Sequence, residues 1–171
     1  SILILGPRQV GKTTIVKHLL AAEANSITYS LQIPDTRLAF EKDPSLLIRR
    51  IKAAKPHPVV FIDEAQKVPE LFDAVQYLID ERLATFVITG SSARKLKRKG
   101  GNLLPGRLKN SRLDPLMWNE FGWLESVGVE ELRIENAPNK TDYTFEKSMI
   151  FGALPGIATQ KDDAERADFL K

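Results

Sequence analysis

The sequence predicts an α/β fold in which helices cover both faces of a parallel β-sheet. Three apolar runs, at residues 2–5, 59–62 and 85–89, have the continuous hydrophobic character of strands that are buried on both faces. Stretches with helical periodicity separate these runs along the chain. Strands that alternate with helices form parallel sheets, because each crossover helix packs back onto a face of the sheet. A chain of 171 residues is long enough for one such domain with a sizeable core.

The composition is typical of a soluble globular protein, since hydrophobic residues make up 43% of the chain and charged residues 27%. No apolar run approaches the roughly 20 residues that a helix needs to span a bilayer. Cysteine is absent, which excludes a disulfide framework and a metal site built on thiolates. The net charge of +3 is too small to indicate a polyanionic partner by itself. We therefore expect a cytoplasmic protein without a membrane partner.

Residues 1–58 contain two predicted strands and two predicted helices. Residues 2–5 form the first strand, and a helix follows from about Lys12. β-Branched and aromatic residues predict a second strand over residues 26–31. An apolar repeat predicts the second helix over residues 43–54, with Pro44 at its first position.

From residue 59 onward, predicted strands continue to alternate with predicted helices. After the strand at residues 59–62, a helix is predicted over residues 68–83. Its apolar side comprises Leu71, Val75, Leu78 and Ile79. The strand at residues 85–89 follows, and residues 109–113 form a weaker strand candidate. The last ten residues stop inside a predicted helix and the first strand has no lead-in, so we expect the sequence to be part of a longer protein.

Between the first strand and the first helix lies a glycine-bounded loop with the pattern of a phosphate-binding site. Gly6 and Gly11 allow backbone angles that a Cβ disfavours, so that successive N–H groups can turn toward an anion beside the positive end of the helix. Lys12 is placed to reach the terminal phosphates, and the Thr13 hydroxyl can bind Mg²⁺. An ordinary glycine turn is the alternative, which the flanking strand and helix disfavour. The predicted binding residues are Gly6, Pro7, Arg8, Gln9, Val10, Gly11, Lys12, Thr13 and Thr14.

Two acidic residues follow the buried strand at residues 59–62. The carboxyl end of a strand in a parallel sheet opens onto the ligand crevice. Asp63 is therefore predicted to hold Mg²⁺ opposite Thr13. Glu64 follows directly, so its side chain should point away from that of Asp63 and act as a general base or as a group that positions water. The alternative is a strand that simply ends in two solvated acids.

Ser91 and Arg107 are further candidates for catalytic roles. Ser91 follows the strand at residues 85–89, and its hydroxyl is expected to sense the γ-phosphate. The alternative is a serine that caps a short helix at residues 93–96. Arg107 is a single arginine after a glycine, and its guanidinium can stabilise the transferring phosphoryl group in cis or across a subunit interface. The alternative is an ordinary surface arginine.

Three other features are interpreted without a role in catalysis. The basic run at residues 94–99 is typical of a solvated loop, and direct contact with nucleic acid is the less favoured interpretation. His18 and His57 are isolated and are not predicted to bind metal. The aromatic residues within 118–123 are interpreted as a hydrophobic packing patch rather than a base-stacking platform.

Taken in order, these motifs resemble those of the AAA+-like ATPases of bacteria and archaea, in which the first two are the Walker A and Walker B motifs. The matching segments are residues 6–13, 61–66, 88–92 and 106–107. More narrowly, they resemble the group whose AAA core precedes a C-terminal domain of unknown function. Residues 113–121 are similar to the L-x-P-L-S-x-x-E-F stretch that closes that core, and residues 151–156 are similar to the Gly-Gly-x-Pro turn that follows it.

The resemblance implies ATP with Mg²⁺, conformational change linked to the nucleotide, and a three-layer P-loop NTPase sandwich with strand order 5-1-4-3-2. It divides the chain into an AAA core over residues 1–125 and, over residues 126–171, a linker with the start of a truncated helical region. The sequence departs from the pattern of such proteins in two ways. The segment that helps to form their adenine pocket and the bulk of their C-terminal domain are not found in this sequence.

The sequence thus predicts an ATPase whose turnover drives conformational change in an attached domain or a partner. The residues predicted to bind and hydrolyse ATP are Lys12, Thr13, Asp63 and Glu64. The partner is expected to be a protein or a nucleic acid reached through the C-terminal domain, and the chain is a candidate homo-oligomer. A nucleotide-gated switch with negligible turnover is the alternative. A small-molecule or nucleotide kinase is a weaker third reading, because Glu64 beside Asp63 suits the activation of water better than an acceptor pocket.

Overall fold

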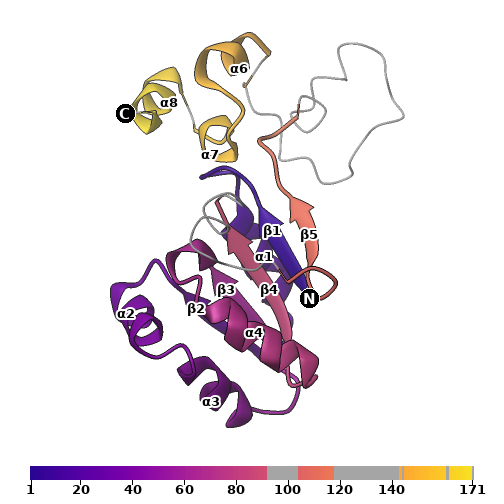
Figure 1. The fold of residues 1–171 in the computed structure, drawn as a ribbon. Coiled ribbons are helices and arrows are strands. Elements are labelled where there is room, and N and C mark those ends of the chain that lie inside the picture. Colours follow the sequence, from indigo (N-terminus) through magenta and orange to yellow (C-terminus); the bar gives the residue numbers. More distant parts are fainter. Residues whose placement is uncertain (92–103, 118–142, 144, 161, 171) are drawn as a thin grey trace, which may run out of the picture. The chain divides into compact units, whose positions relative to one another are not determined.

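A computed structural model describes residues 1–91, 104–117, 143, 145–160 and 162–170 of the chain (Figure 1). These residues divide into two compact units. The first comprises Ser1–Pro7 and Lys12–Leu113, and the second comprises Arg8–Gly11 and Asp114–Lys171.

The first unit is built on a five-stranded sheet in which all neighbouring strands are parallel. The strands are β1 (Ile2–Leu5), β2 (Ser26–Ser30), β3 (Val59–Asp63), β4 (Thr85–Gly90) and β5 (Lys109–Arg112). Their order is β2-β3-β4-β1-β5, which confirms the order 5-1-4-3-2 read from the opposite edge. Because every strand runs in the same direction, all five carboxyl ends lie at one end of the sheet.

Helices cover both faces of this sheet, as the alternating pattern predicts. The helices of the unit are α1 (Lys12–Leu20), α2 (Pro34–Lys42), α3 (Leu46–Lys52), the 3-10 helix η1 (Ala65–Lys67) and α4 (Leu71–Asp80). The connection from β1 to β2 crosses the sheet in one direction, whereas the connection from β3 to β4 crosses it in the other. Right-handed crossovers therefore place α1 and α4 on opposite faces, and Figure 1 shows α4 in front of β3 and β4.

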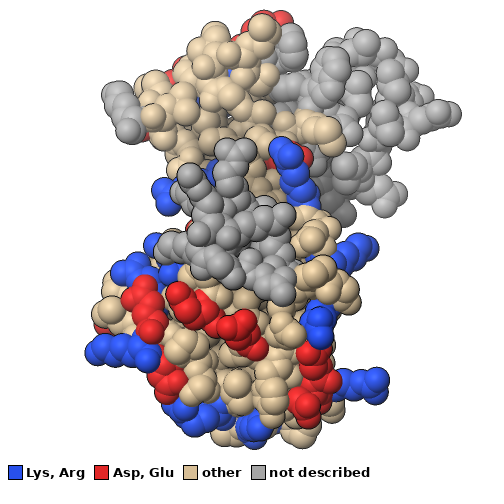
Figure 2. Space-filling model, in the orientation of Figure 1, with Lys and Arg blue, Asp and Glu red and all other residues tan. Residues whose placement is uncertain are grey.

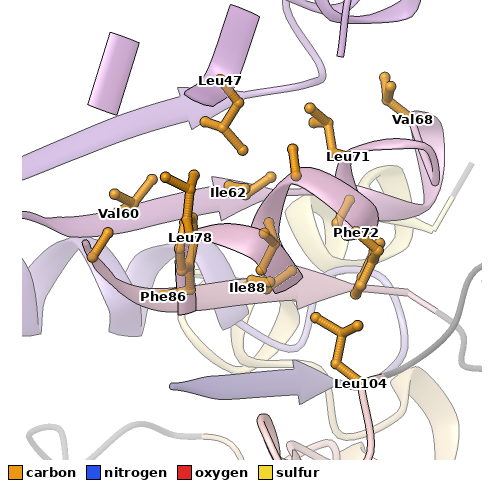
Figure 3. Packing of buried hydrophobic residues seen from close by; sticks show 14 of the residues in the cluster. Leu47, Val60, Ile62, Val68, Leu71, Phe72, Leu78, Phe86, Ile88 and Leu104 are labelled. Carbon is orange, nitrogen blue, oxygen red and sulfur yellow. The ribbon is translucent and has the colours of Figure 1, made fainter. Parts of the chain in front are cut away.

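A hydrophobic cluster fills the space between the sheet and the helices α3 and α4 (Figure 3). Its members include Leu47, Val60, Ile62, Leu71, Phe72, Leu78, Phe86 and Ile88, each at most 2% exposed. Burial of one such side chain contributes about 1.5–3 kcal/mol. The predicted apolar side of the helix is confirmed, since Val75 is also buried and Ile79 packs against the cluster. This packing fixes β3 and β4, the strands whose ends carry the candidate site.

Three local features differ from the sequence-based expectation. Helix α2 is not predicted, because its nine residues are mostly polar and only Phe40 is buried. Pro34 occupies the first turn of α2, whereas Pro44 lies before α3, which begins at Leu46. The predicted helix over residues 68–83 forms only as α4, which ends at Asp80.

The second unit contains the helices α6 (Phe145–Phe151), α7 (Pro155–Ala158) and α8 (Asp163–Phe169). Tyr143, Ile157 and Ala158 form its buried cluster. The predicted C-terminal helix is present as α8, and the Asp162 carboxylate caps it by accepting hydrogen bonds from the N–H groups of Ala164 and Glu165 at 3.0 and 2.9 Å.

Several sequence-based expectations fall outside the described residues. They are the basic run at residues 94–99, the short helix at residues 93–96, the aromatic stretch at residues 118–123 and the domain boundary at residue 125. Each of these stays a prediction. Within the described ranges, none of the helices combines the length and the apolar character needed to cross a membrane.

Candidate nucleotide-binding site

The loop that follows β1 begins at the carboxyl end of the sheet. The Gly6 N–H donates to the Gly90 carbonyl at 3.3 Å, which ties the start of the loop to the end of β4. Gln9 and Gly11 have positive φ angles of 65° and 87°. A Cβ added to Gly11 would meet no atom within 4 Å, so the positive φ explains the glycine and the space beside it is open. The loop is therefore a candidate anion cradle, which stays a prediction.

Lys12 is the first residue of α1 and is 5% exposed. Its ammonium group donates hydrogen bonds to the carbonyl of Gly6 at 2.9 Å and to the carbonyl of Pro7 at 2.6 Å. The side chain therefore folds back over the loop and places its charge beside the cradle. An anion bound there would meet this ammonium group and the amino end of α1 together.

Asp63, the last residue of β3, is the centre of the polar contacts in the site and is only 2% exposed. The hydroxyls of Thr13 and Thr89 donate to its Oδ1 atom at 2.8 and 2.6 Å. The Gln32 amide donates to its Oδ2 atom at 3.3 Å. A buried carboxylate is costly unless hydrogen bonds compensate it, and three donors from separate elements supply that compensation here.

The oxygen atoms of Thr13 and Asp63 fit the chemistry of Mg²⁺. Hydroxyl and carboxylate oxygens are hard ligands, and these two lie 2.8 Å apart beside the loop. Among the described residues, no group of three or more His, Cys, Asp or Glu side chains is arranged to hold a metal ion. A site with one carboxylate suits Mg²⁺, which usually takes its remaining ligands from phosphate and water.

Glu64 directly follows β3 but does not continue it. Its φ and ψ angles of 60° and 46° are left-handed, which costs a non-glycine residue about 1–2 kcal/mol. Its N–H donates to the Thr89 hydroxyl at 3.2 Å, and its carboxylate accepts a hydrogen bond from the Gln66 amide. The direction of Glu64 is thus set by this turn and its contacts, rather than by strand alternation with Asp63.

Ser91 lies one residue beyond β4 and contacts Gln66. The side-chain amide nitrogen of Gln66 donates to the Ser91 hydroxyl at 3.1 Å, and the Ser91 N–H donates to the side-chain amide oxygen of Gln66, Oε1, at 3.3 Å. The structure therefore brings Ser91 into the same hydrogen-bonded group as Glu64. Its expected contact with a γ-phosphate stays a prediction.

Arg107 is not brought together with the other candidate residues. Its guanidinium donates to the carboxylate of Asp80, the last residue of α4, at 2.6 Å. Arg107 precedes β5, whose first residue, Lys109, pairs with Ile2 at the amino end of β1. It therefore lies at the end of the sheet opposite to the loop, and its proposed role across a subunit interface stays a prediction.

The ion pair between Arg107 and Asp80 makes a small, testable contribution to stability. A hydrogen bond from the guanidinium holds the pKa of the Asp80 carboxyl below its usual range. A lowered pKa in the folded state stabilises the protein above the unfolded value of about 3.9, and this stability is lost as the pH falls. In urea unfolding, the Arg107→Ala protein should therefore be slightly less stable than the parent at pH 7, and the gap should narrow and close as the pH falls below the unfolded value and through the lowered pKa of Asp80. A gap that persists in acid would point to lost packing instead.

The sequence assigned no individual role to Thr89, Gln66 or Gln32, although Thr89 and Gln66 lie within the matched segments 88–92 and 61–66. The register of the sheet pairs Ile62 with Ile88, so the next residues, Asp63 and Thr89, emerge side by side. This adjacency needs the strand order, which only the resemblance implied. With that order applied to the ends of the strands, Thr89 could have been found.

Thr89 should make a measurable contribution to stability, because its fully buried hydroxyl serves two partners. The Thr89→Val protein would leave Asp63 with one donor fewer and the N–H of Glu64 without this acceptor. We expect its free energy of unfolding to fall by about 1–3 kcal/mol, the usual cost of an unsatisfied buried polar group. Urea denaturation measures this, and Thr89→Ser, which keeps the hydroxyl, should recover most of the loss. Equal losses in both variants would assign the effect to packing of the methyl group.

Comparison with known proteins places this geometry in a family. A sequence model of the AAA_14 family, described as an AAA domain, matches residues 1–122. The uncharacterized proteins Rv2008c of Mycobacterium tuberculosis and Mb2031c of Mycobacterium bovis are each 34% identical over 125 residues, which cover 71% of this chain and 26% of the relative. RuvB of Leuconostoc mesenteroides, a subunit of the Holliday junction branch migration complex, is 26% identical over 174 residues, covering 93% of this chain and 48% of RuvB.

Among solved structures, the chain is similar to PCH-2 of C. elegans, with a TM-score of 0.48 and 17% identity over 74% of this chain and 38% of that one. It is also similar to domain III of the replication initiation protein DnaA of Thermotoga maritima, with a TM-score of 0.44 and 16% identity over 99% of this chain and 73% of that one. The chain spans about a quarter of the length of its mycobacterial relatives. From the match over residues 1–122, the chain belongs to the AAA_14 family of AAA domains, one of the AAA+-like P-loop ATPase families.

Proposed function

We propose that this protein binds ATP at the loop over residues 6–14 and hydrolyses it with Mg²⁺, so that turnover drives a conformational change in an attached domain or a partner. The observation that carries the proposal is the partly buried hydrogen bond from Thr13 to Asp63 at 2.8 Å, which joins the loop to the end of β3. Membership of an AAA family supports nucleotide binding independently.

The loop and Lys12 supply the binding of phosphate in this proposal. Backbone N–H groups of the loop and the amino end of α1 face the anion. Lys12 Nζ, which now donates to two carbonyls of the loop, would exchange them for phosphate oxygens. Such charge-assisted hydrogen bonds are stronger than bonds to neutral carbonyls, so the exchange favours the bound state.

Thr13 and Asp63 would hold Mg²⁺ in the proposed site. When bound, the ion neutralises charge that develops on the phosphate oxygens. Thr89 and Gln32 keep the Asp63 carboxylate in place through their hydrogen bonds to Oδ1 and Oδ2. This arrangement would let Asp63 act without reorienting when the ligand arrives.

Glu64 is the proposed general base or water-positioning residue. It adjoins Asp63 at the carboxyl end of β3, and its side chain is partly exposed. A carboxylate there can accept a proton from a water molecule that attacks the γ-phosphate, or orient that water. The alternative function is a switch with negligible turnover, in which the hydrogen bond from Gln66 would withhold the Glu64 carboxylate from water.

The partner and the assembly state are part of the proposal. We infer a cytoplasmic protein that acts on a protein or a nucleic acid and that can form homo-oligomers, in which Arg107 would serve the site of a neighbouring copy. Figure 2 shows basic and acidic side chains on the same face of the described chain, so the charges visible there do not favour a polyanionic partner over a protein.

Phosphate release by the intact protein tests the proposal. We expect hydrolysis of ATP that depends on Mg²⁺ and stops when the ion is chelated, together with saturable binding of a fluorescent ATP analogue. Binding without phosphate release, with or without candidate partners, would favour the switch. A phosphorylated product formed only when an acceptor is added would favour the kinase. A protein that binds no nucleotide would overturn the proposal.

A further inference from the structure

We propose that Gln66 is a positioning residue that aims the Glu64 carboxylate by bridging it to Ser91 at the end of β4. This inference rests on the proposed function, because it assigns Gln66 a role in the same hydrolytic step. Gln66 does not touch the reacting atoms in this proposal. It acts through Glu64.

The bridge uses both the nitrogen and the oxygen of the Gln66 side-chain amide, and the residue is 8% exposed. The amide nitrogen donates one hydrogen bond to Glu64 Oε2 and another to the Ser91 hydroxyl at 3.1 Å. The amide oxygen accepts from the Ser91 N–H at 3.3 Å. A nearly buried amide with its donor and acceptor groups both engaged is held in one orientation, so it can hold its partners as well.

The backbone makes this bridge possible. The left-handed conformation of Glu64 ends β3, and the following 3-10 turn, Ala65–Lys67, brings residue 66 back beside residue 64. The Val68 N–H closes that turn on the Ala65 carbonyl. Glu64 is therefore linked to the adjacent strand twice, by its N–H through Thr89 and by its carboxylate through Gln66 and Ser91.

The side chain at position 66 must both donate and accept hydrogen bonds. Asparagine is one methylene shorter and would not span the same partners. Glutamate has the same length but no N–H groups, so it would set a second carboxylate against Glu64. Gln66→Glu therefore tests the need for an N–H donor at position 66 most directly. Gln66→Met keeps the length of the side chain without hydrogen bonds, and it is a second variant in case the first does not fold.

In the described part of the chain, the hydrogen bond from Gln66 is made to Glu64 Oε2, and Glu64 is partly exposed, so we propose that its other carboxylate oxygen, Oε1, meets the water molecule. The position of the Glu64 carboxylate affects the rate of hydrolysis strongly, since a misplacement of a reacting group by about 1 Å can lower the rate roughly 100-fold. We expect the turnover number of Gln66→Glu and Gln66→Met to fall by roughly 10-fold to 100-fold, while the KM for ATP of the uncharged Gln66→Met protein stays within about twofold of the parent. The KM stays because the loop, Lys12 and Asp63 are unchanged.

The decisive measurement is a double-mutant cycle with Glu64→Gln, using phosphate release and ATP affinity on the intact protein. If Gln66 acts through Glu64, adding Gln66→Met to Glu64→Gln should lower turnover no further. Gln76→Glu makes the same chemical change on α4, away from Glu64, and should hydrolyse ATP like the parent.

The outcomes separate this inference from the function on which it rests. A parent protein that binds ATP but releases no phosphate would overturn the proposed hydrolysis, and the role of Gln66 with it. A parent that hydrolyses ATP while both Gln66 variants keep its turnover number would overturn the Gln66 inference alone. Losses that add fully to those of Glu64→Gln would assign Gln66 a structural role and would also overturn it.

Discussion

The Glu64→Gln protein is expected to release phosphate roughly 10²–10⁴-fold more slowly than the parent, the usual contribution of a positioned general base. The substitution keeps the size of the side chain and removes its basic carboxylate. Its backbone contact with Thr89 is retained, so the turn after β3 should keep its shape. Single-turnover phosphate release measures the effect without interference from product release.

ATP affinity should stay the same or increase in this variant. The loop, Lys12 and Thr13 are unchanged, and one negative charge close to the phosphates has been removed. A fall in turnover without a loss of affinity is the signature of an interaction made mainly in the transition state. Glu70→Gln is the matched control, since Glu70 is an exposed glutamate six residues along the chain and makes no contact in the site. Hydrolysis at the parent's rate by Glu64→Gln would remove this residue from the mechanism.

The central strands could be predicted from the sequence because burial on both faces leaves a simple signal. The apolar runs at residues 2–5, 59–62 and 85–89 correspond to β1, β3 and β4 with ends that differ by at most one residue. The weaker prediction at residues 109–113 is also present as β5, although all four of its residues are exposed. Pairing with β1 holds that edge strand, and such tertiary pairing leaves little trace in local sequence.

Helix α2 shows where the pattern fails. Apart from Phe40, its residues are at least partly exposed, so they carry no regular apolar repeat. Phe40 is placed by contacts with distant residues, including an edge-on packing against Tyr29 with ring centroids 5.2 Å apart. Contacts of this kind depend on the assembled fold, and a periodicity argument cannot supply them.

The residues of the candidate site could be located from the sequence, but their connections could not. Lys12, Thr13 and Asp63 were predicted from a loop motif and a strand end, and the structure brings them together. The bridge from Glu64 through Gln66 to Ser91 requires a left-handed residue directly after β3. A left-handed glutamate is rare and carries no sequence signal, so the direction of Glu64 was assigned from strand alternation instead.

The Lys12→Ala protein is expected to lose tight binding of Mg-ATP. Lys12 is 5% exposed, and its Nζ atom donates to the carbonyls of Gly6 and Pro7, so its charge is placed at the cradle with little access to water. Hydrogen bonds to charged groups contribute about 1.5–3 kcal/mol each, so losing one such contact should weaken binding by about 10-fold to more than 100-fold. Equilibrium titration with a fluorescent ATP analogue measures this change.

A matched control lies on the same helix. Lys17 is an exposed lysine in the last turn of α1, and Lys17→Ala removes the same charge from the protein while leaving the loop intact. If long-range attraction of the nucleotide dominated, both variants would weaken binding alike, and the effect would shrink as salt is added. If the loop is the site, only Lys12→Ala should lose affinity, and salt should change this difference little, because a nearly buried ammonium group is poorly screened. Unchanged affinity in Lys12→Ala would show that ATP binds elsewhere.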